Sequence, residues 1–190
     1  MQIIQTVSEN TIYVGASDRR LAKFENLFPI PRGVSYNAYV ILDEKTSLLD
    51  TADASVGAQF LENVAAALDG RKLDYLIVDH MEPDHAAMIE AVLVRWPDLR
   101  LVVNAKTLPM LKMYFPTDNA AIDDALVVKE GDTLDLGKHK LTFVMAPMVH
   151  WPEVMMTFDT TTGTLFSADA FGTFGALEGA LFADEVDFAG

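Results

Sequence analysis

A short apolar run, residues 74–78, passes directly into the most polar segment of the chain. Residues 79–85, with the sequence DHMEPDH, place two imidazoles and three carboxylates within seven positions. A short apolar run of this kind is typical of a buried strand, so the polar segment is expected at a strand end. Layered folds put binding and catalytic groups on the loops that leave such strands. The chain is therefore expected to build a polar site on the edge of a buried sheet.

The pattern along the chain predicts strands, then alternating strands and helices, then strands again. The expected strands are residues 11–16, 35–42, 47–51, 74–78, 101–103, 126–129, 133–136, 140–146, 154–159 and 164–167. The second and third of these are expected to pair through the turn at residues 43–45. The expected helices are residues 55–68, capped by Ser55 and stopped by Gly70, a second that follows the loop 79–84 and runs to about Arg95, and residues 106–114. This order predicts an α/β (α+β) domain with two packed sheets and helices outside them.

Length and composition limit the class of protein. The 190 residues are enough for one domain with a core, and a single domain over residues 1–190 is expected. The net charge of −14 disfavours nucleic acids and anionic membranes as partners. The absence of cysteine excludes disulfides, iron–sulfur clusters and thiol nucleophiles. The N-terminus lacks a signal-peptide pattern, and the longest apolar run, residues 86–94, is too short to span a bilayer, so a cytoplasmic protein is expected.

Four side chains of the polar segment are candidate metal ligands: His80, Glu82, Asp84 and His85. Imidazole and carboxylate together suit iron, manganese and zinc. A loop is expected to turn all four inward, because Pro83 cannot lie inside a helix. An exposed acidic loop with two incidental histidines is the alternative. Four potential ligands that leave one apolar strand disfavour it.

Two later residues, His150 and Asp169, also follow predicted strands. Either one alone would more often be a packed histidine or a turn-forming aspartate. Their common placement at strand ends adds both to the candidate site. A carboxylate has two oxygens and can bridge two metal ions. His139 lies in a predicted tight turn and is expected to be exposed and outside the site.

The ordered set of ligands, H-x-E-x-D-H followed by a histidine and an aspartate, resembles that of flavodiiron proteins, also called A-type flavoproteins. Hydrolases of the metallo-β-lactamase fold usually show H-x-H-x-D-H, whereas this chain has Glu82 at the second histidine position. Further segments share the resemblance: YNAYVI at 36–41, LDT at 49–51, residues 76–85, GDTLDLG at 131–137 and PMVHWP at 147–152. The resemblance covers essentially the whole chain.

The resemblance implies a four-layer αββα sandwich of the metallo-β-lactamase type that holds two iron ions. One iron would take His80, Glu82 and His150. The other would take Asp84 and His85, and Asp169 would bridge them. The family reduces dioxygen to water, or nitric oxide to nitrous oxide. Its electrons come from FMN in a flavodoxin-like domain, which a head-to-tail homodimer brings to the partner's irons, and rubredoxin-type proteins are further expected donors.

Two departures from the family pattern are visible. No histidine follows His150, so the family's last ligand, downstream of the bridging aspartate, has no counterpart and the fold is expected to be incomplete at its C-terminus. The chain also has no glycine-rich phosphate loop and no flavodoxin-like domain, so FMN is expected only through a partner domain or chain. An excised portion, a split gene product and a degenerate paralogue all fit these departures.

Two other functions stay open on the sequence. A dinuclear hydrolase of the same fold would attack its substrate with a metal-bound hydroxide. A non-catalytic diiron module would bind or sense oxygen without turnover. Glu82 disfavours the hydrolase, because a hard carboxylate favours iron over zinc. The identity of the bound metal would separate the hydrolase from the reductase.

Overall fold

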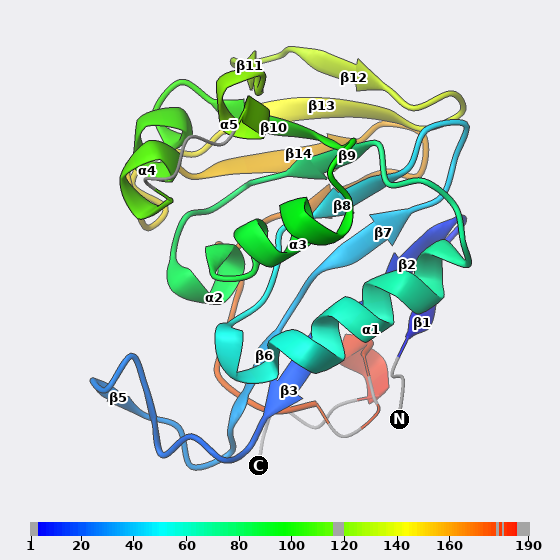
Figure 1. Cartoon of the computed structure of the whole chain (residues 1–190). Helices are drawn as coiled ribbons and strands as arrows, with labels where there is room; N and C mark the ends of the chain where they lie inside the picture. The colour runs from blue at the N-terminus through cyan, green and yellow to red at the C-terminus, as the bar shows by residue number, and fades with distance from the viewer. Residues whose placement is uncertain (1–3, 116–119, 178, 180, 186–190) are drawn as a thin grey trace. The chain divides into compact units, whose positions relative to one another are not determined.

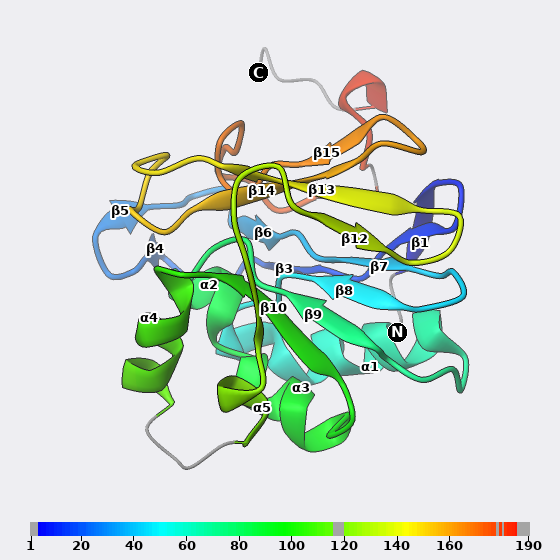
Figure 2. The same cartoon turned by 90° about the horizontal axis from the view of Figure 1, so that it is seen from above.

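The computed structural model describes residues 4–115, 120–177, 179 and 181–185. The chain divides into two compact units. The first unit comprises residues 1–16 and 36–172, and the second comprises residues 17–35 and 173–190. All six candidate ligands belong to the first unit, whose layers are seen in Figures 1 and 2.

The first unit contains a seven-stranded mixed sheet. In spatial order its strands are β1 (Gln5–Ser8), β2 (Thr11–Tyr13), β7 (Tyr39–Ile41), β8 (Ser47–Leu49), β9 (Tyr75–Ile77), β10 (Arg100–Asn104) and β11 (Leu126–Val128). The strands from β1 to β8 pair antiparallel, and those from β8 to β11 pair parallel. The predicted pairing of β7 with β8 is confirmed. The carboxyl ends of β8, β9 and β10 therefore lie along one edge, which is where open α/β sheets bind ligands.

A second sheet of four antiparallel strands belongs to the same unit. Its strands, in order, are β12 (Thr133–Asp135), β13 (Lys140–Met145), β14 (Met155–Asp159) and β15 (Thr164–Phe166). Alternating buried and exposed residues along β12 and β13 leave one face of this sheet for the core. The predicted strands of this region are confirmed to within one or two residues.

Helices cover the first sheet on the side away from the second (Figure 2). They are η1 (Ala54–Val56), α1 (Gly57–Leu68), α2 (Pro83–Ala86), α3 (Ile89–Arg95), α4 (Thr107–Tyr114) and α5 (Ala120–Asp123). The cap expected at Ser55 lies two residues earlier, at Asp53. Its carboxylate accepts the Ser55 N–H at 2.7 Å and caps the 3₁₀ turn η1, which precedes α1. The expected helix after the loop 79–84 is divided into α2 and α3, and α3 ends at Arg95 as predicted.

The core of the first unit lies between its two sheets. The first sheet supplies Ile41, Leu49, Ile77, Val102 and Val128, and the second supplies Leu134, Leu141, Phe143, Met155 and Phe166, with Leu136 from the turn between β12 and β13. The central parallel strands β8, β9 and β10 are largely buried on both faces, as continuous apolar runs predict, whereas the edge strand β11 exposes Val127. The mixed α/β class and the two packed sheets are thus confirmed. Of the four layers that the resemblance implies, the described residues of this unit supply three, since their helices cover only the first sheet.

The second unit consists mainly of short strands and turns that the sequence pattern did not predict, and the expected strand 35–42 divides into β6 (Val34–Tyr36) and β7. The strand pairs are β3 (Ala16–Asp18) with β6 (Val34–Tyr36) and β4 (Lys23–Phe24) with β5 (Phe28–Pro29), and η2 (Ala183–Glu185) follows later. The rings of Phe24 and Phe28 pack on Phe174, with centroids 5.1 and 6.3 Å away. Strands of two residues carry no alternation, so pattern alone could not find them.

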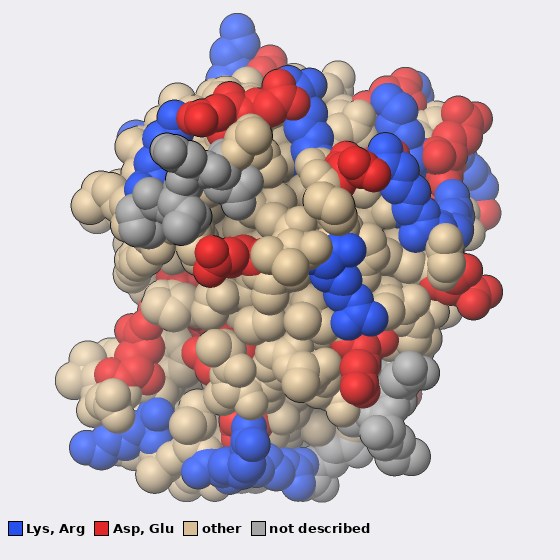
Figure 3. Space-filling view, in the orientation of Figure 1, with Lys and Arg blue, Asp and Glu red and all other residues tan. Residues whose placement is uncertain are grey.

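On the face seen in Figure 3 acidic and basic side chains are interspersed, and many of them lie next to one another. The net charge of −14 is therefore not gathered on this face into one acidic field. Among the residues that the structure describes, no helix combines the length and the apolar composition needed to cross a bilayer.

Candidate metal centre

The segment after β9 divides between a loop and a helix. His80 and Glu82 follow the strand without regular secondary structure, Glu82 in extended backbone, and α2 begins at Pro83. The predicted loop is therefore too long: Asp84 and His85 lie on the first turn of α2. Proline excludes only the interior of a helix, and its fixed φ suits the first helical position, where no N–H bond is needed. The turn directs His85 back toward the sheet edge, where it is buried.

One group of four side chains surrounds the end of β9, and we call it the first metal group: His80, Glu82, His150 and Asp169. Its candidate donor atoms all lie within 4.8 Å of one another. Oε2 of Glu82 lies 3.1 Å from Nε2 of His80 and 2.7 Å from Nε2 of His150. Oδ2 of Asp169 lies 3.3 Å from Nε2 of His80. Two loops far apart in sequence thus present imidazole nitrogens to the same carboxylates.

The second metal group consists of Asp84, His85 and Asp169. Its donor atoms also lie within 4.8 Å of one another. Oδ1 of Asp169 lies 2.9 Å from Nε2 of His85, and Oδ2 of Asp84 lies 3.7 Å from the same nitrogen. Asp169 therefore turns one oxygen toward each group. All six residues expected from the sequence meet at this place.

The backbone before Asp169 is unusual. Ala168 has φ +46°, in the left-handed region that residues with a side chain rarely adopt. Such conformations persist where the surrounding structure fixes them, and they gather at functional sites. Here the turn after β15 (Thr164–Phe166) carries Asp169 to a position between the two groups.

The carboxylates around His80 and His85 favour positive charge on both rings. Burial alone would lower the pKa of His80, but the carboxylates of Asp169, Glu153 and Glu82 outweigh it and raise that pKa to about 11. His85 behaves alike, since Asp169 and Asp50 raise its pKa despite burial. The pKa of Asp169 is lowered, because hydrogen bonds from both imidazoles exceed the effect of burial. In the metal-free protein, protons on these rings balance the carboxylates, and a bound metal would displace them.

Asp84 shows the opposite behaviour. Burial, together with the charges of Asp169 and Glu82, raises its pKa to about 6 despite the nearby His85. Its Oδ1 is buried without a hydrogen-bond partner among the described residues. A buried carboxylate oxygen with no partner costs stability unless a cation is bound to it. A cation bound in the second metal group would therefore compensate the buried carboxylate of Asp84.

The sequence pattern missed two acidic residues beside the histidines. Oε1 of Glu153 lies 2.7 Å from Nδ1 of His80, and Oδ2 of Asp50 lies 3.0 Å from Nδ1 of His85. Asp50 directly follows the buried strand β8 at the same sheet edge, a signal that could have been used. Glu153 is a buried acid in the loop between β13 and β14, where only contact with His80 identifies it.

The expectation for His139 is wrong. Its side chain is fully buried rather than exposed, and its Nδ1 lies 2.8 Å from Oδ2 of the equally buried Asp159. The turn at Gly137 folds the ring back against β14, where this carboxylate compensates for its burial. His139 does stay outside both metal groups.

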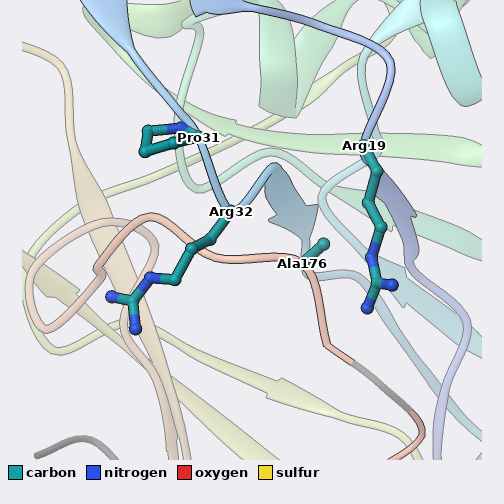
Figure 4. Close-up of a pocket in the computed structure, with 4 residues that line it drawn as sticks. All are labelled: Arg19, Pro31, Arg32 and Ala176. Atoms are coloured by element: carbon teal, nitrogen blue, oxygen red, sulfur yellow. The ribbon is translucent and has the colours of Figure 1, made fainter. Parts of the chain in front are cut away.

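The second unit has a pocket of its own, lined by Arg19, Pro31, Arg32 and Ala176 (Figure 4). The two guanidinium groups lie on either side of Ala176 and do not converge on one point. Anion sites need donors that converge. The pocket therefore lacks the arrangement of an anion site.

Comparison with known families settles the relationship of the chain. A family model described as "ODP family beta lactamase" matches residues 34–188. The chain belongs to this family. The sequence and structural relatives of this domain confirm the predicted resemblance to flavodiiron proteins.

One sequence relative is the anaerobic nitric oxide reductase flavorubredoxin of Klebsiella pneumoniae. It is 38% identical over 185 aligned positions, and the match covers 95% of this chain and 37% of that protein. Two solved structures are similar. The rubredoxin oxygen:oxidoreductase of Desulfovibrio gigas has a TM-score of 0.90 at 31% identity, over 97% of this chain and 45% of that one. The flavodiiron protein of Giardia intestinalis has a TM-score of 0.87 at 28% identity, over 96% and 44%. This chain thus spans less than half the length of each relative.

Proposed function

We propose that the two metal groups hold a pair of iron ions, and that this domain reduces dioxygen or nitric oxide with electrons from a partner. The observation that carries the proposal is the position of Asp169, whose two oxygens face different groups. A carboxylate in this position can bridge two metals and hold them a few ångströms apart. The similarity to a nitric oxide reductase flavorubredoxin and to a rubredoxin oxygen:oxidoreductase supports the reaction class.

The residues present fit two irons. In the proposal, His80, Glu82 and His150 hold one ion, Asp84 and His85 hold the other, and Asp169 bridges them. The mixture of imidazole and carboxylate suits iron, and the hard carboxylate of Glu82 shifts the preference away from zinc. The unpartnered Oδ1 of Asp84 supports a second ion, since one metal in the first group would leave this oxygen unsatisfied.

A pair of redox-active metals held by these residues would supply electrons to a small diatomic substrate, which zinc cannot do. The protein residues determine how such a molecule arrives. The side chains of His80 and His85 are 0% and 9% exposed, whereas that of His150 is 56% exposed. The accessible side of the site therefore lies at His150, and we propose that substrate and electron donor approach there.

Electrons would come from FMN held by a flavodoxin-like domain or protein, or from a rubredoxin-type donor. The printed names of the relatives, flavorubredoxin and rubredoxin oxygen:oxidoreductase, support such partners. We propose that residues 1–190 act as one diiron domain, that it works as a homo-oligomer, and that it does so in the cytoplasm.

A single-turnover experiment tests the function without a donor protein. The domain is loaded with iron, reduced with dithionite, desalted without air and mixed with nitric oxide. Oxidation of two bound ferrous ions to ferric would supply two electrons, which with two protons from solvent convert two nitric oxide molecules to one nitrous oxide and one water, so gas chromatography should detect one nitrous oxide per diiron site. Asp169→Asn is the control, because an amide cannot bridge two metals with two oxygens.

Other outcomes separate the alternatives. An iron-loaded protein that is oxidised by neither dioxygen nor nitric oxide would contradict the reductase and favour a binding module. Hydrolysis of a thioester by the zinc-loaded protein, with no reaction of the iron-loaded one, would favour the hydrolase.

A further inference from the structure

We propose that Glu153 and Asp50 form a carboxylate clamp that presets His80 and His85 for metal binding, and that Glu153 controls the affinity of the first metal group. This inference rests on the proposed metal centre, but not on its reaction. Neither residue is expected to touch a metal. Each would act as a positioning residue through the histidine that it contacts.

The clamp holds the His80 peptide from both sides. Oε1 of Glu153 accepts the backbone N–H of Met81 at 3.0 Å as well as facing the His80 ring. Oδ1 of Asp50 accepts the backbone N–H of Asp79 at 2.7 Å, while its Oδ2 faces His85. The residues before and after His80 are thus each tied to one of the two carboxylates that contact the histidine rings. This arrangement fixes both the ring and its backbone.

Ring orientation follows from these contacts. A carboxylate can only accept, so it keeps a proton on the Nδ1 that faces it. The lone pair of a neutral ring then lies on Nε2, and in both histidines Nε2 is the nitrogen that faces Asp169 and the other candidate ligands. Carboxylates that bind the far nitrogen of a ligating histidine orient it and strengthen it as a donor. His150 differs, because its Nδ1 has no such carboxylate among the described residues.

Glu153 also joins separate parts of the fold. It lies three residues after His150, and its carbonyl oxygen accepts from Nδ2 of Asn104 at 2.5 Å, at the end of β10. One residue therefore connects the loop of His80, the loop of His150 and the edge of the parallel sheet. Both loops supply ligands to the first metal group, so movement of Glu153 would disturb that group before the second.

Burial indicates that Glu153 does more than stabilise the fold. Its side chain is fully buried, as is that of His80, and its Oε2 has no partner among the described residues. A buried carboxylate with an unsatisfied oxygen is a weak source of stability, and an apolar residue of similar size is often no worse. An orienting role toward a metal ligand accounts for the residue.

Two substitutions test the proposal by metal affinity. Glu153→Gln leaves an oxygen that can accept both N–H groups but removes the charge, and Glu153→Leu removes the acceptor. Chelator competition with Fe²⁺ and Zn²⁺ should show affinity at the first metal group reduced about 10- to 100-fold in the glutamine variant, with a larger loss in the leucine variant. Asp159→Asn is the matched control, since it alters an equally buried carboxylate on Nδ1 of His139, outside both groups. The control should bind metal like the wild type.

A second measurement needs no variant. In the zinc-loaded, diamagnetic protein, ¹H–¹⁵N spectra should show a slowly exchanging Nδ1–H on His80 and metal bound at Nε2. Zinc bound through Nδ1 of His80 would overturn the proposal. Unchanged affinity in both Glu153 variants, or an equal loss in the Asp159 control, would overturn it too. None of these readouts depends on nitric oxide reduction, so failure of the clamp and failure of the proposed reaction are distinguishable.

Discussion

Replacing Asp84 by asparagine should make the metal-free protein more stable while it weakens the second metal group. The side chain of Asp84 is only 14% exposed, and burial raises its pKa from 3.8 to about 6. Each pKa unit corresponds to about 1.4 kcal/mol, so keeping this group ionised above pH 7 costs the fold about 3 kcal/mol. Asparagine removes the charge but buries an amide of its own. The expected net gain in the free energy of unfolding is therefore about 1 to 3 kcal/mol.

The sign of the pH dependence follows from the raised pKa. Between pH 3.8 and about 6 the native state holds a proton that the unfolded chain has released. The contribution of Asp84 to stability is therefore intact below this window and is lost as the pH rises through it. The variant and the wild type should be alike near pH 4 and should differ fully above about pH 7.

Urea unfolding of chelator-treated protein at several pH values measures this difference. Asp98→Asn is the control, because the same chemical change on an exposed side chain should alter stability by less than about 0.5 kcal/mol. Iron titration of the same variant should show loss of the second ion. A metal-free Asp84→Asn protein that is no more stable than the wild type at pH 7.5 would refute the reasoning, as would a gain that does not change with pH.

Three further predictions follow from the same site and core. Glu82→His creates the usual hydrolase pattern, so the ratio of iron to zinc retained after growth with both metals should fall, and an unchanged ratio would show that Glu82 does not select the metal. The two metal groups should fill unequally, since among the described residues the first offers four side chains and the second three; calorimetric titration that finds two equal affinities would contradict this. Phe143→Ala should lower the free energy of unfolding by about 3 to 5 kcal/mol, because the ring is fully buried between the sheets. Val144→Ala, on the exposed face of the same strand, should lower it by less than about 1 kcal/mol. Similar losses for the two variants in urea unfolding would argue against the sheet packing.

The strands and the ligand set could be predicted because their signals are local. Apolar runs marked β9 and β10, and alternation marked β13 and β14, so the two-sheet arrangement followed from the order of elements. Four of the six ligands are gathered within residues 80–85. The short strands β4 and β5, which pair with each other, show no periodic pattern and were not predicted.

The supporting carboxylates were not predicted, because the histidines that they contact are distant in sequence; only Asp50, directly after the buried strand β8, gave a signal that could have been used. Glu153 lies 73 positions from His80, and Asp50 lies 35 positions from His85. Only the fold brings β8 beside β9 and the loop after β13 against their ends. His139 was misplaced for the same reason, since its partner Asp159 lies 20 positions away on the next strand. A turn marked by glycine predicts an exposed histidine only if the fold places no buried carboxylate within hydrogen-bonding distance of the ring.

The bridging position of Asp169 is the central claim, and diffraction at the iron absorption edge tests it most directly. Crystals of the iron-loaded domain should show two anomalous peaks, one in the first metal group and one in the second. One oxygen of Asp169 should bind each ion. A single peak, or two peaks with Asp169 bound to only one of them, would contradict the account.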